Sequence, residues 1–407
     1  MQISDTAHLG YCTNIHAGET WPDTLQSLKK YCIPLKEKLC PDRPFGIGLR
    51  LSNKSSEELA QPEVLTAFHD WLNEQNLYVF TINGFPYGAF HGQVVKDQVH
   101  HPDWTTPERL SYSKRLFDIL AVILPEGLDG GVSTSPISYK FWHKDAAALD
   151  QAKSIACQQM MDLVAHLVAI KQKFNKSLHL DIEPEPDGIL ENSRGFIGFY
   201  QNYLLDKGAE NLAQQLACNI EMAQDFIREH IQLCYDVCHF AVGFESPKEV
   251  IDDVLKAGIG IGKIQISAAL KASLPPDSSI RESIKKELSP FNESTYLHQV
   301  SMKDTNGAIS YFPDLQDGLD HLANKDFQEL RTHFHVPLFV EEFGLLQATR
   351  QDIIETLAIW EKVAFTNHLE IETYTWDVLP EALKANLQDS IERELRWVMG
   401  IIKTSEK

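Results

Sequence analysis

Long apolar runs are missing from this sequence. The longest such run, at residues 116–125, is interrupted by Asp118 and is shorter than the roughly 20 residues needed to cross a bilayer. We therefore interpret it as part of a buried helix and expect no insertion into a membrane. The N-terminus also lacks a basic start followed by an apolar stretch, so we expect no signal peptide.

Cysteine pairs with metal-binding or redox spacing are missing as well. The seven cysteines are scattered, odd in number and include no CxxC pair. This usage favours reduced thiols and predicts a cytoplasmic protein. Cys234 and Cys238 are four residues apart, but they lie around the end of an expected strand, so we do not expect them to bind zinc as thiolates.

Basic residues are fewer than acidic ones in this sequence. Lys and Arg number 37 against 57 Asp and Glu, which gives a formal net charge of -20. Such a surface repels phosphate backbones, so nucleic acid is not an expected partner. We expect a small-molecule metabolite instead. A locally basic pocket remains compatible with the composition, and the oligomeric state stays open.

No GxGxxG motif follows an expected strand. The glycine-rich segment at residues 257–263 precedes a strand, whereas a dinucleotide-binding fold needs its glycines after the first strand. Internal repeats, low-complexity segments and a clear linker are also missing. We therefore expect residues 1–407 to form a single domain, within the size range of α/β barrels.

The chain alternates short strand-like runs with longer helical ones, on an ordinary globular composition of 43% hydrophobic residues. Helical patterns cover, among others, residues 22–39, 62–75, 144–174 and 193–229. The expected strands are residues 10–16, 45–52, 77–88, 130–136, 178–186, 231–242, 262–270 and 368–380. Eight β/α units predict a parallel (β/α)8 TIM barrel.

One region does not fit the simple count of eight units. Residues 295–303 and 331–343 both have strand character, yet they lie between the seventh and eighth expected strands. We interpret residues 271–345 as an inserted segment over the C-terminal mouth of the barrel. The alternative is that this region supplies an additional barrel strand.

The fifth expected strand, LHLDIEPEP, carries polar side chains on one face. His179, Asp181 and Glu183 alternate with three apolar residues and are followed by prolines. Successive side chains of a strand point to opposite faces, and active sites of such barrels lie at the C-terminal ends of the strands. Glu183 is therefore expected to point into a site at the mouth.

Three further strands direct polar groups to the same end. Asp236 precedes His239 in a DxxH pattern, Gln265 has inward parity on the seventh strand, and Glu372 shares a face with Glu370 on the last. Crowded carboxylates must be protonated or bridged by a cation. The oxygen ligands favour Mg or Mn.

Imidazole ligands would change the preferred metal. Coordination by both His239 and His335 would suit Zn. For each of these polar residues the structural alternative is a satisfied hydrogen-bonded pair, such as Asp236 with His239. Glu370 has the same parity as Glu372 and is an alternative inward residue.

The motifs LDIE and DVCH and a late glutamate on the closing strand resemble the xylose isomerase-like superfamily, which includes sugar isomerases, sugar 3-epimerases and metal-dependent apurinic endonucleases. Four longer stretches, GYCTNIHAGETW, NGFPYGAFHG, HFHVPLF and ETYTWDVLP, resemble the EboE family of metabolite-traffic proteins over nearly the whole chain. The superfamily resemblance implies a metal set of Glu183, Asp236 and Glu372, with His239 in contact with substrate.

Two departures from the superfamily pattern matter. Gln265 stands where the resemblance implies a histidine, so His335 or His298 is needed to compensate. Asn83 and the serines at 133–135 stand where a trinuclear endonuclease has histidines. Together with the negative charge, these departures argue against a role in DNA repair.

These observations lead to one main functional hypothesis. We expect a metal-dependent sugar or sugar-phosphate isomerase or epimerase that works through an enediolate, with Glu183 and Glu372 moving the proton and His239 steadying an oxygen. Gln265 and His335 are expected as further ligands of a Mg, Mn or Zn ion. The expected substrate contacts are His239, His298, Trp376, Phe85 and Asn83.

Two alternatives stay open. The same barrel mouth would serve a non-catalytic metabolite-binding protein of the EboE type, which the glutamine at position 265 favours. A metal hydrolase of the endonuclease-like branch would need a second or third ion.

Overall fold

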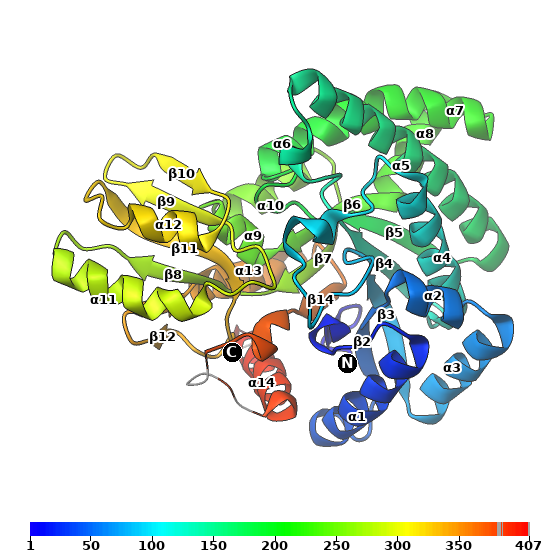
Figure 1. Ribbon diagram of the computed structural model, residues 1–407. Helices are drawn as coiled ribbons and strands as arrows, with labels where there is room; N and C mark the ends of the chain where they lie inside the picture. Colours follow the sequence, from blue (N-terminus) through cyan, green and yellow to red (C-terminus); the bar gives the residue numbers. More distant parts are fainter. Residues whose placement is uncertain (381–383, 385, 406–407) are drawn as a thin grey trace.

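Eight parallel strands form the central barrel of the computed structural model, which describes residues 1–380, 384 and 386–405 (Figure 1). Hydrogen bonding joins the strands in the order β1-β14-β7-β6-β5-β4-β3-β2. A parallel bridge between Cys12 and Gly48 connects the ends of this series and closes the barrel. The strands are β1 (His8–Tyr11), β2 (Phe45–Arg50), β3 (Leu77–Asn83), β4 (Asp129–Thr134), β5 (Ser177–Ile182), β6 (Ile231–Asp236), β7 (Ile261–Ile266) and β14 (His368–Ile371). The predicted (β/α)8 barrel is confirmed.

Helices connect the strands and cover the outside of the barrel (Figure 1). Their ends carry the expected signals: Thr20 and Asp23 form a capping box at α1, and Asn175 adopts a left-handed conformation after α5. The main helices are α1 (Trp21–Leu39), α2 (Asn53–Leu59), α3 (Pro62–Glu74), α4 (Pro107–Ile123), α5 (Ala146–Phe174), α6 (Ser193–Phe199), α7 (Ala209–Leu216), α8 (Ile220–His230), α10 (Pro247–Lys256), α13 (Arg350–Val363) and α14 (Leu387–Ser405). Within the described residues, every helix is too short or too polar to traverse a bilayer.

The predicted strands extend past the C-terminal ends of the observed ones, and the sixth and the last do so most. The sixth was expected to reach residue 242, but β6 ends at Asp236, whose carboxylate accepts a hydrogen bond from the backbone N–H of His239 at 3.2 Å and caps α9 (Val237–Val242). The last was expected to reach residue 380, but β14 ends at Ile371 and a 3₁₀ helix follows at Tyr374–Asp377. At the mouth of the barrel the chain therefore leaves both strands and continues as a helix.

The inserted segment folds as its own antiparallel sheet beside the barrel (Figure 1, yellow). Its strands are ordered β10-β9-β11-β8-β13-β12, so the alternative of an additional barrel strand is wrong. Its elements are β8 (Ala269–Ser273), α11 (Ser278–Leu288), β9 (Val300–Asp304), β10 (Ile309–Phe312), α12 (Leu315–His321), β11 (Phe327–His335), β12 (Glu342–Phe343) and β13 (Leu346–Ala348). The C-terminal end of β11 carries its side chains to the barrel mouth.

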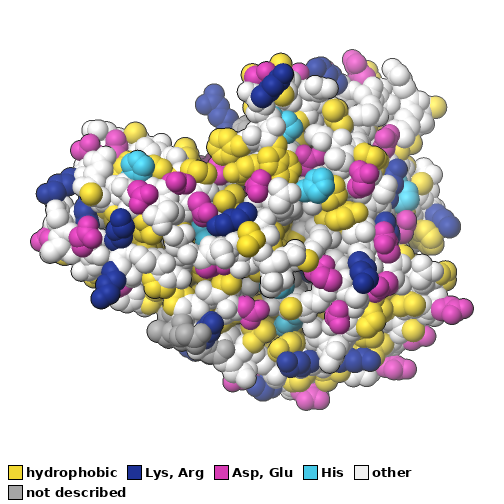
Figure 2. Space-filling view, in the orientation of Figure 1, with side chains coloured by type: hydrophobic (Ala, Val, Ile, Leu, Met, Phe, Trp, Pro, Cys, Tyr) yellow, Lys and Arg dark blue, Asp and Glu magenta, His cyan; other side chains and the backbone are white. Residues whose placement is uncertain are grey.

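The visible surface mixes both signs of charge. Acidic and basic side chains are interspersed over the barrel and the inserted segment in the view of Figure 2. The excess of acidic residues is therefore not gathered into one patch on this face.

A buried carboxyl joins the inserted segment to the last helix. Glu394 of α14 accepts hydrogen bonds from the backbone N–H of Leu338 at 3.1 Å and from the hydroxyl of Thr373 at 2.9 Å. Burial raises the pKa of Glu394 to about 8, although both hydrogen bonds act to lower it. The group is therefore protonated in the folded protein at neutral pH.

We expect Glu394 to make the protein less stable as the pH rises. A pKa that is higher in the folded than in the unfolded chain contributes stability that is full below about pH 4.5 and is lost as the pH approaches about 8. Between pH 6 and 8 the loss is on the order of 2 kcal/mol. Glu394→Gln should flatten this dependence in urea unfolding curves, and an equal slope in both proteins would contradict the prediction.

Candidate metal centre and cavity

Three carboxylates from distant parts of the chain meet at the mouth of the barrel. Glu183 follows β5, Asp236 ends β6 and Glu372 follows β14, and one oxygen of each lies within 4.8 Å of the others. All three side chains are buried. Strand alternation therefore indicated the correct face for each of them.

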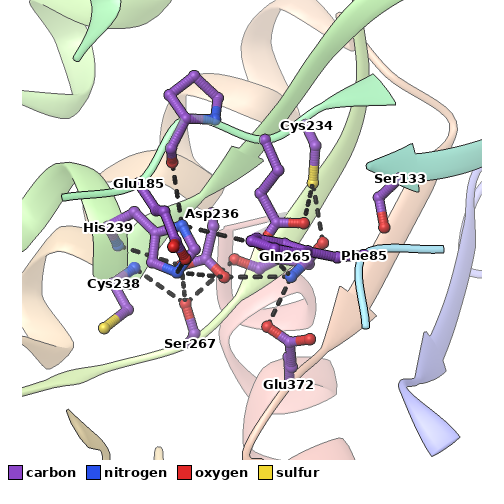
Figure 3. Close-up of polar contacts among 12 residues, drawn as sticks. Phe85, Ser133, Glu185, Cys234, Asp236, Cys238, His239, Gln265, Ser267 and Glu372 are labelled. Carbon is purple, nitrogen blue, oxygen red and sulfur yellow. Dashed lines mark hydrogen bonds and ion pairs between the residues drawn. The ribbon is translucent and has the colours of Figure 1, made fainter. Parts of the chain in front are cut away.

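The amide of Gln265, on β7, lies among these carboxylates (Figure 3). Its nitrogen Nε2 donates to Glu183 at 3.1 Å, to Asp236 at 3.1 Å and to Glu372 at 2.6 Å. Its oxygen Oε1 accepts a hydrogen bond from the thiol of Cys234 at 2.8 Å. The amide nitrogen thus occupies the position between the three acidic groups.

Other side chains hold the carboxylates in place. The amides of Asn14 and Asn83 donate to Oε1 of Glu372 at 2.8 and 3.1 Å. The hydroxyl of Ser267 donates to Oδ1 of Asp236 at 2.7 Å. Asn14 lies in the short 3₁₀ helix after β1, Asn83 ends β3 and Ser267 follows β7, so the rim of the barrel orients the cluster.

Crowding and burial change how these groups bind protons. Burial raises the pKa of Glu183 and of Glu372 well above the ordinary value, and neighbouring carboxylates raise it further. Burial also acts to raise the pKa of Asp236, but the neighbouring His239 and His335 outweigh it and the pKa is lowered. Burial and crowding therefore favour the protonated form of the two glutamates unless a cation lies between them.

Two imidazoles stand beside the carboxylates with their tautomers determined by carbonyl groups. Nδ1 of His239 donates to the backbone oxygen of Pro184 at 3.0 Å. Nδ1 of His333 donates to Oε1 of Gln299 at 2.8 Å, and that amide is oriented because its Nε2 donates to the backbone oxygen of Pro186. The two Nε2 atoms face each other at 3.1 Å, so they share either a proton or a cation.

A third imidazole, His335, lies at the end of β11. Its Nδ1 donates to the backbone oxygen of Glu372 at 2.8 Å, and its buried Nε2 has no hydrogen-bond partner among the described residues. Burial lowers the pKa of His335 to about 4, so the ring is neutral at pH 7. Ring nitrogens of His335 and His239 and an oxygen of Asp236 lie within 4.8 Å of one another.

The donor set fits a divalent cation. Protein metal sites typically use buried carboxylates and neutral imidazoles as ligands. In such sites the second ring nitrogen of each histidine is usually bonded to a carbonyl or carboxylate, as it is here. A half-turn of the Gln265 amide would direct Oε1 toward the carboxylates and Nε2 toward Cys234, which adds a fourth oxygen. Glu183, Asp236, Glu372 and Gln265 would then hold the ion, with His335 at the edge of the set.

A small cavity of about 60 Å³ opens beside the carboxylates. Phe85 and Asn83 line it as predicted, together with Glu183, His239 and Glu372. Its cover is aromatic: the ring centroids of Phe90, Tyr296 and Tyr374 lie 5.0 to 5.1 Å apart. Since ligand pockets usually hold about 300 Å³ or more, a sugar would need this cover to move.

Two residues predicted to contact substrate do not line the cavity. Both ring nitrogens of His298 are bonded inside the inserted segment, to the backbone oxygen of His333 at 3.1 Å and to Glu293 at 2.8 Å. Trp376 lies near Phe339, with the ring centroids 6.5 Å apart. The alternation that placed Trp376 beside Glu372 ends with β14, because the chain then turns into a 3₁₀ helix.

The sequence analysis missed several residues of the cavity, with Glu185 and His100 among them. Glu185 lies between His100, at 2.8 Å, and His239, at 3.9 Å. Its position two residues after Glu183 is the one signal in the sequence that could have indicated it, although β5 ends at Ile182 and strict alternation stops there. His100 comes from the loop between β3 and α4, and only the fold places that loop over the mouth.

No protein-family model and no curated protein sequence matches this chain. Solved structures do match it. One is a xylose isomerase-like TIM barrel protein from Mycobacterium smegmatis in complex with magnesium, at 11% identity and a TM-score of 0.50 over 98% of this chain and 97% of the other. Another is a D-tagatose 3-epimerase-like protein, at 8% identity and a TM-score of 0.50 over 98% of this chain and 100% of the other.

At these identities the likeness shows the fold alone. The chain has the fold of xylose isomerase-like TIM barrels, as predicted. The resemblance to the EboE family is not confirmed by these comparisons and stays a prediction.

Proposed function

We propose that this protein is a metal-dependent isomerase or epimerase of a sugar or sugar phosphate. The observation that carries the proposal is the position of Glu183 and Glu372. Both carboxylates line the same cavity, come from different sides of the mouth and share the amide of Gln265. Two carboxylic groups of this kind suit removal of a proton at one face of a carbon and its return elsewhere.

One glutamate removes a proton from the substrate and the other donates one to it. Glu183, as the carboxylate, takes a proton from the carbon beside the substrate carbonyl, which gives an enediolate. Glu372, as the acid, returns a proton to the neighbouring carbon or to the opposite face. The two groups re-equilibrate with solvent before the next turnover. His239, at the cavity wall, steadies a substrate oxygen.

A divalent ion, Mg, Mn or Zn, would contribute electrostatic stabilisation of the negative charge that develops on the substrate oxygens. The residues of this chain perform the other tasks. Asn14 and Asn83 keep Glu372 directed into the cavity, and the aromatic cover of Phe90, Tyr296 and Tyr374 excludes water from the reacting carbon.

Hydrogen exchange tests the proposal. The protein is incubated in D₂O with a panel of ketoses and ketose phosphates, with Mg²⁺, Mn²⁺ or Zn²⁺, and with EDTA as the metal-free control. We expect deuterium to appear at the carbon beside the carbonyl for at least one sugar, only with metal. Binding of a sugar without exchange under any condition would contradict the proposal.

A second candidate function is metabolite binding without turnover, as the resemblance to EboE implies. The specific observation in its favour is the Gln265 amide nitrogen, which lies within hydrogen-bond distance of one oxygen of each of the three acidic groups. With protons on the glutamates, this arrangement needs no cation. The same D₂O experiment separates the two candidates, because a binding protein gives no exchange.

Replacing Gln265 by histidine is expected to strengthen metal binding. A neutral imidazole is a better ligand than an amide for Zn²⁺ and Mn²⁺, and Gln265→His removes the donor that occupies the carboxylates. We expect affinity to increase roughly tenfold or more, equal to about 1.4 kcal/mol, in isothermal titration calorimetry. Gln347→His, on β13 of the inserted segment, is the control; unchanged affinity in Gln265→His would place the metal elsewhere.

A further inference from the structure

A second group of imidazoles and carboxylates lies at the opposite, N-terminal end of the barrel. Asp129 begins β4, His179 lies near the start of β5 and His368 begins β14. One ligand atom of each lies within 4.8 Å of the others. In the sheet order, β14 is separated from β5 by β7 and β6, so this cluster joins opposite walls. The proposed reaction at the mouth makes no use of it.

His179 is held as a metal-ligating histidine usually is. Its Nδ1 donates to Oδ1 of Asp181 at 2.6 Å, inside the barrel. Its Nε2 faces Oδ2 of Asp129 at 3.7 Å. A carboxylate on one ring nitrogen orients the ring and makes the other nitrogen a better ligand, the arrangement found in carboxylate–histidine–zinc triads.

The separations around Asp129 suit a shared ion. Nε2 of His368 lies 3.7 Å from Oδ1 of Asp129, the same separation as that between His179 and Oδ2. These distances are too long for hydrogen bonds. Two ligands about 2.0–2.1 Å from one tetrahedral Zn²⁺ lie roughly 3.3–3.4 Å apart, so small side-chain shifts would complete such a site. Nε2 of His368 also forms a hydrogen bond with the backbone oxygen of Asp129 at 3.2 Å, and a bound ion would replace this bond.

The barrel interior has room for the buried carboxylate of Asp181, although burying its charge costs free energy. Asp181 is fully buried, and its Oδ2 has no hydrogen-bond partner among the described residues. A Cβ atom at Gly262 would lie 1.9 Å from Oδ1 of Asp181, and one at Gly131 would lie 2.4 Å from Oδ2. Glycine at both positions is therefore required, and the buried negative charge needs a positive charge close by.

The cluster can be reached from solvent. The side chain of Asp129 is 34% exposed. A surface hollow of about 450 Å³ lies on the same end of the barrel and is lined by His8, Tyr78 and Leu128. His8 and His368 each have one buried ring nitrogen without a partner in the described part of the chain. Asp129 thus gives the cluster one partly exposed ligand, while His179 and His368 are buried.

We propose that Asp129, His179 and His368 bind one divalent ion of the kind that prefers imidazole, such as Zn²⁺, with Asp181 as the group that positions His179. Two imidazoles and a carboxylate, with water as the fourth ligand, form a tetrahedral set. The ion links β4, β5 and β14 across the floor of the barrel and stabilises its closure. The inference is independent of the function proposed for the mouth.

The direct test locates the ion. Crystals of the full chain are soaked with Zn²⁺, and anomalous difference maps are recorded above and below the zinc absorption edge. The proposal expects a peak between Asp129, His179 and His368, whether or not the mouth also binds zinc. A map without a peak there, including one with peaks only at the mouth, overturns it and leaves a protonated His179 paired with both aspartates.

A matched pair of variants tests the same site in solution. Asp129→Asn removes one ligand at a partly exposed position, and Glu126→Gln removes a charge from an exposed residue on the same end of the barrel. Equilibrium dialysis should show Zn²⁺ binding at this site weakened at least tenfold in Asp129→Asn and unchanged in Glu126→Gln. Zn²⁺ should also raise the melting temperature less in Asp129→Asn than in Glu126→Gln. Equal affinity in both variants overturns the proposal.

Discussion

Glu372→Gln is expected to lower the rate of hydrogen exchange into substrate roughly 10²- to 10⁴-fold, the usual contribution of a positioned acid or base. The change keeps the size of the side chain, so the hydrogen bonds that Asn14 and Asn83 donate to Oε1 can remain. What disappears is the group that carries the proton. The assay is deuterium incorporation in D₂O, with saturating divalent metal, for the sugar that wild-type protein exchanges fastest.

The same change is expected to stabilise the metal-free protein. Burial and neighbouring carboxylates raise the pKa of Glu372 in the folded state, so its contribution to stability is full below the unfolded value and is lost as the pH rises through the folded value. An amide has no such loss. Above about pH 5 in EDTA, Glu372→Gln should therefore melt at a higher temperature than wild type while its exchange activity falls.

A surface variant provides the control for both measurements. Glu282 lies exposed on α11, and Glu282→Gln removes one negative charge without touching the mouth. It should leave exchange and melting temperature unchanged. If Glu372→Gln kept wild-type exchange, Glu372 would not be the proton carrier and the proposed chemistry would be wrong.

Lys263→Met is expected to destabilise the fold by about 3–5 kcal/mol, the cost of leaving one member of a buried ion pair without its partner. Nζ of Lys263 lies 2.6 Å from Oε2 of Glu370, and both side chains are fully buried. Lys263 also donates to the hydroxyl of Ser133 at 3.1 Å. With methionine in its place, the carboxylate of Glu370 stays in the barrel interior without a counter-charge.

Urea unfolding measures the loss of stability in Lys263→Met. Two further variants show whether the loss comes from the unpaired charge of Glu370. Lys263→Met combined with Glu370→Gln should recover part of the lost stability, because the unpaired charge is gone. Lys256→Met, which removes an exposed lysine of α10 paired with Asp253 at 3.9 Å, should change stability by less than about 1 kcal/mol. Equal losses in Lys263→Met and Lys256→Met would show that the buried pair contributes little.

Lys263 in the barrel interior also acts electrostatically on the carboxyl groups at the mouth. Its charge acts to lower the pKa of Glu183 and of Glu372. Glu370 had the same strand parity as Glu372 and was an alternative inward residue for the site. The structure separates the two roles: Glu370 pairs with Lys263, and Glu372 lines the cavity.

The amino-acid sequence by itself determined the barrel and the carboxylate cluster. Both follow from local rules, because alternation along a strand decides which face a side chain takes, and parallel strands of a barrel all end at the same rim. Glu183, Asp236, Gln265 and Glu372 could therefore be placed together without coordinates.

Only the tertiary structure decided where the chain leaves its strands and what the inserted segment supplies. Trp376 does not line the cavity, because β14 ends at Ile371 and the strand alternation ends with it. His298 does not line it either, because its Nδ1 is bonded to the backbone oxygen of His333. His333 and His335 reach His239 only because β11 belongs to a second sheet packed beside the mouth. Contacts between residues about 100 positions apart depend on how whole sheets pack, and no local pattern of residues encodes that arrangement.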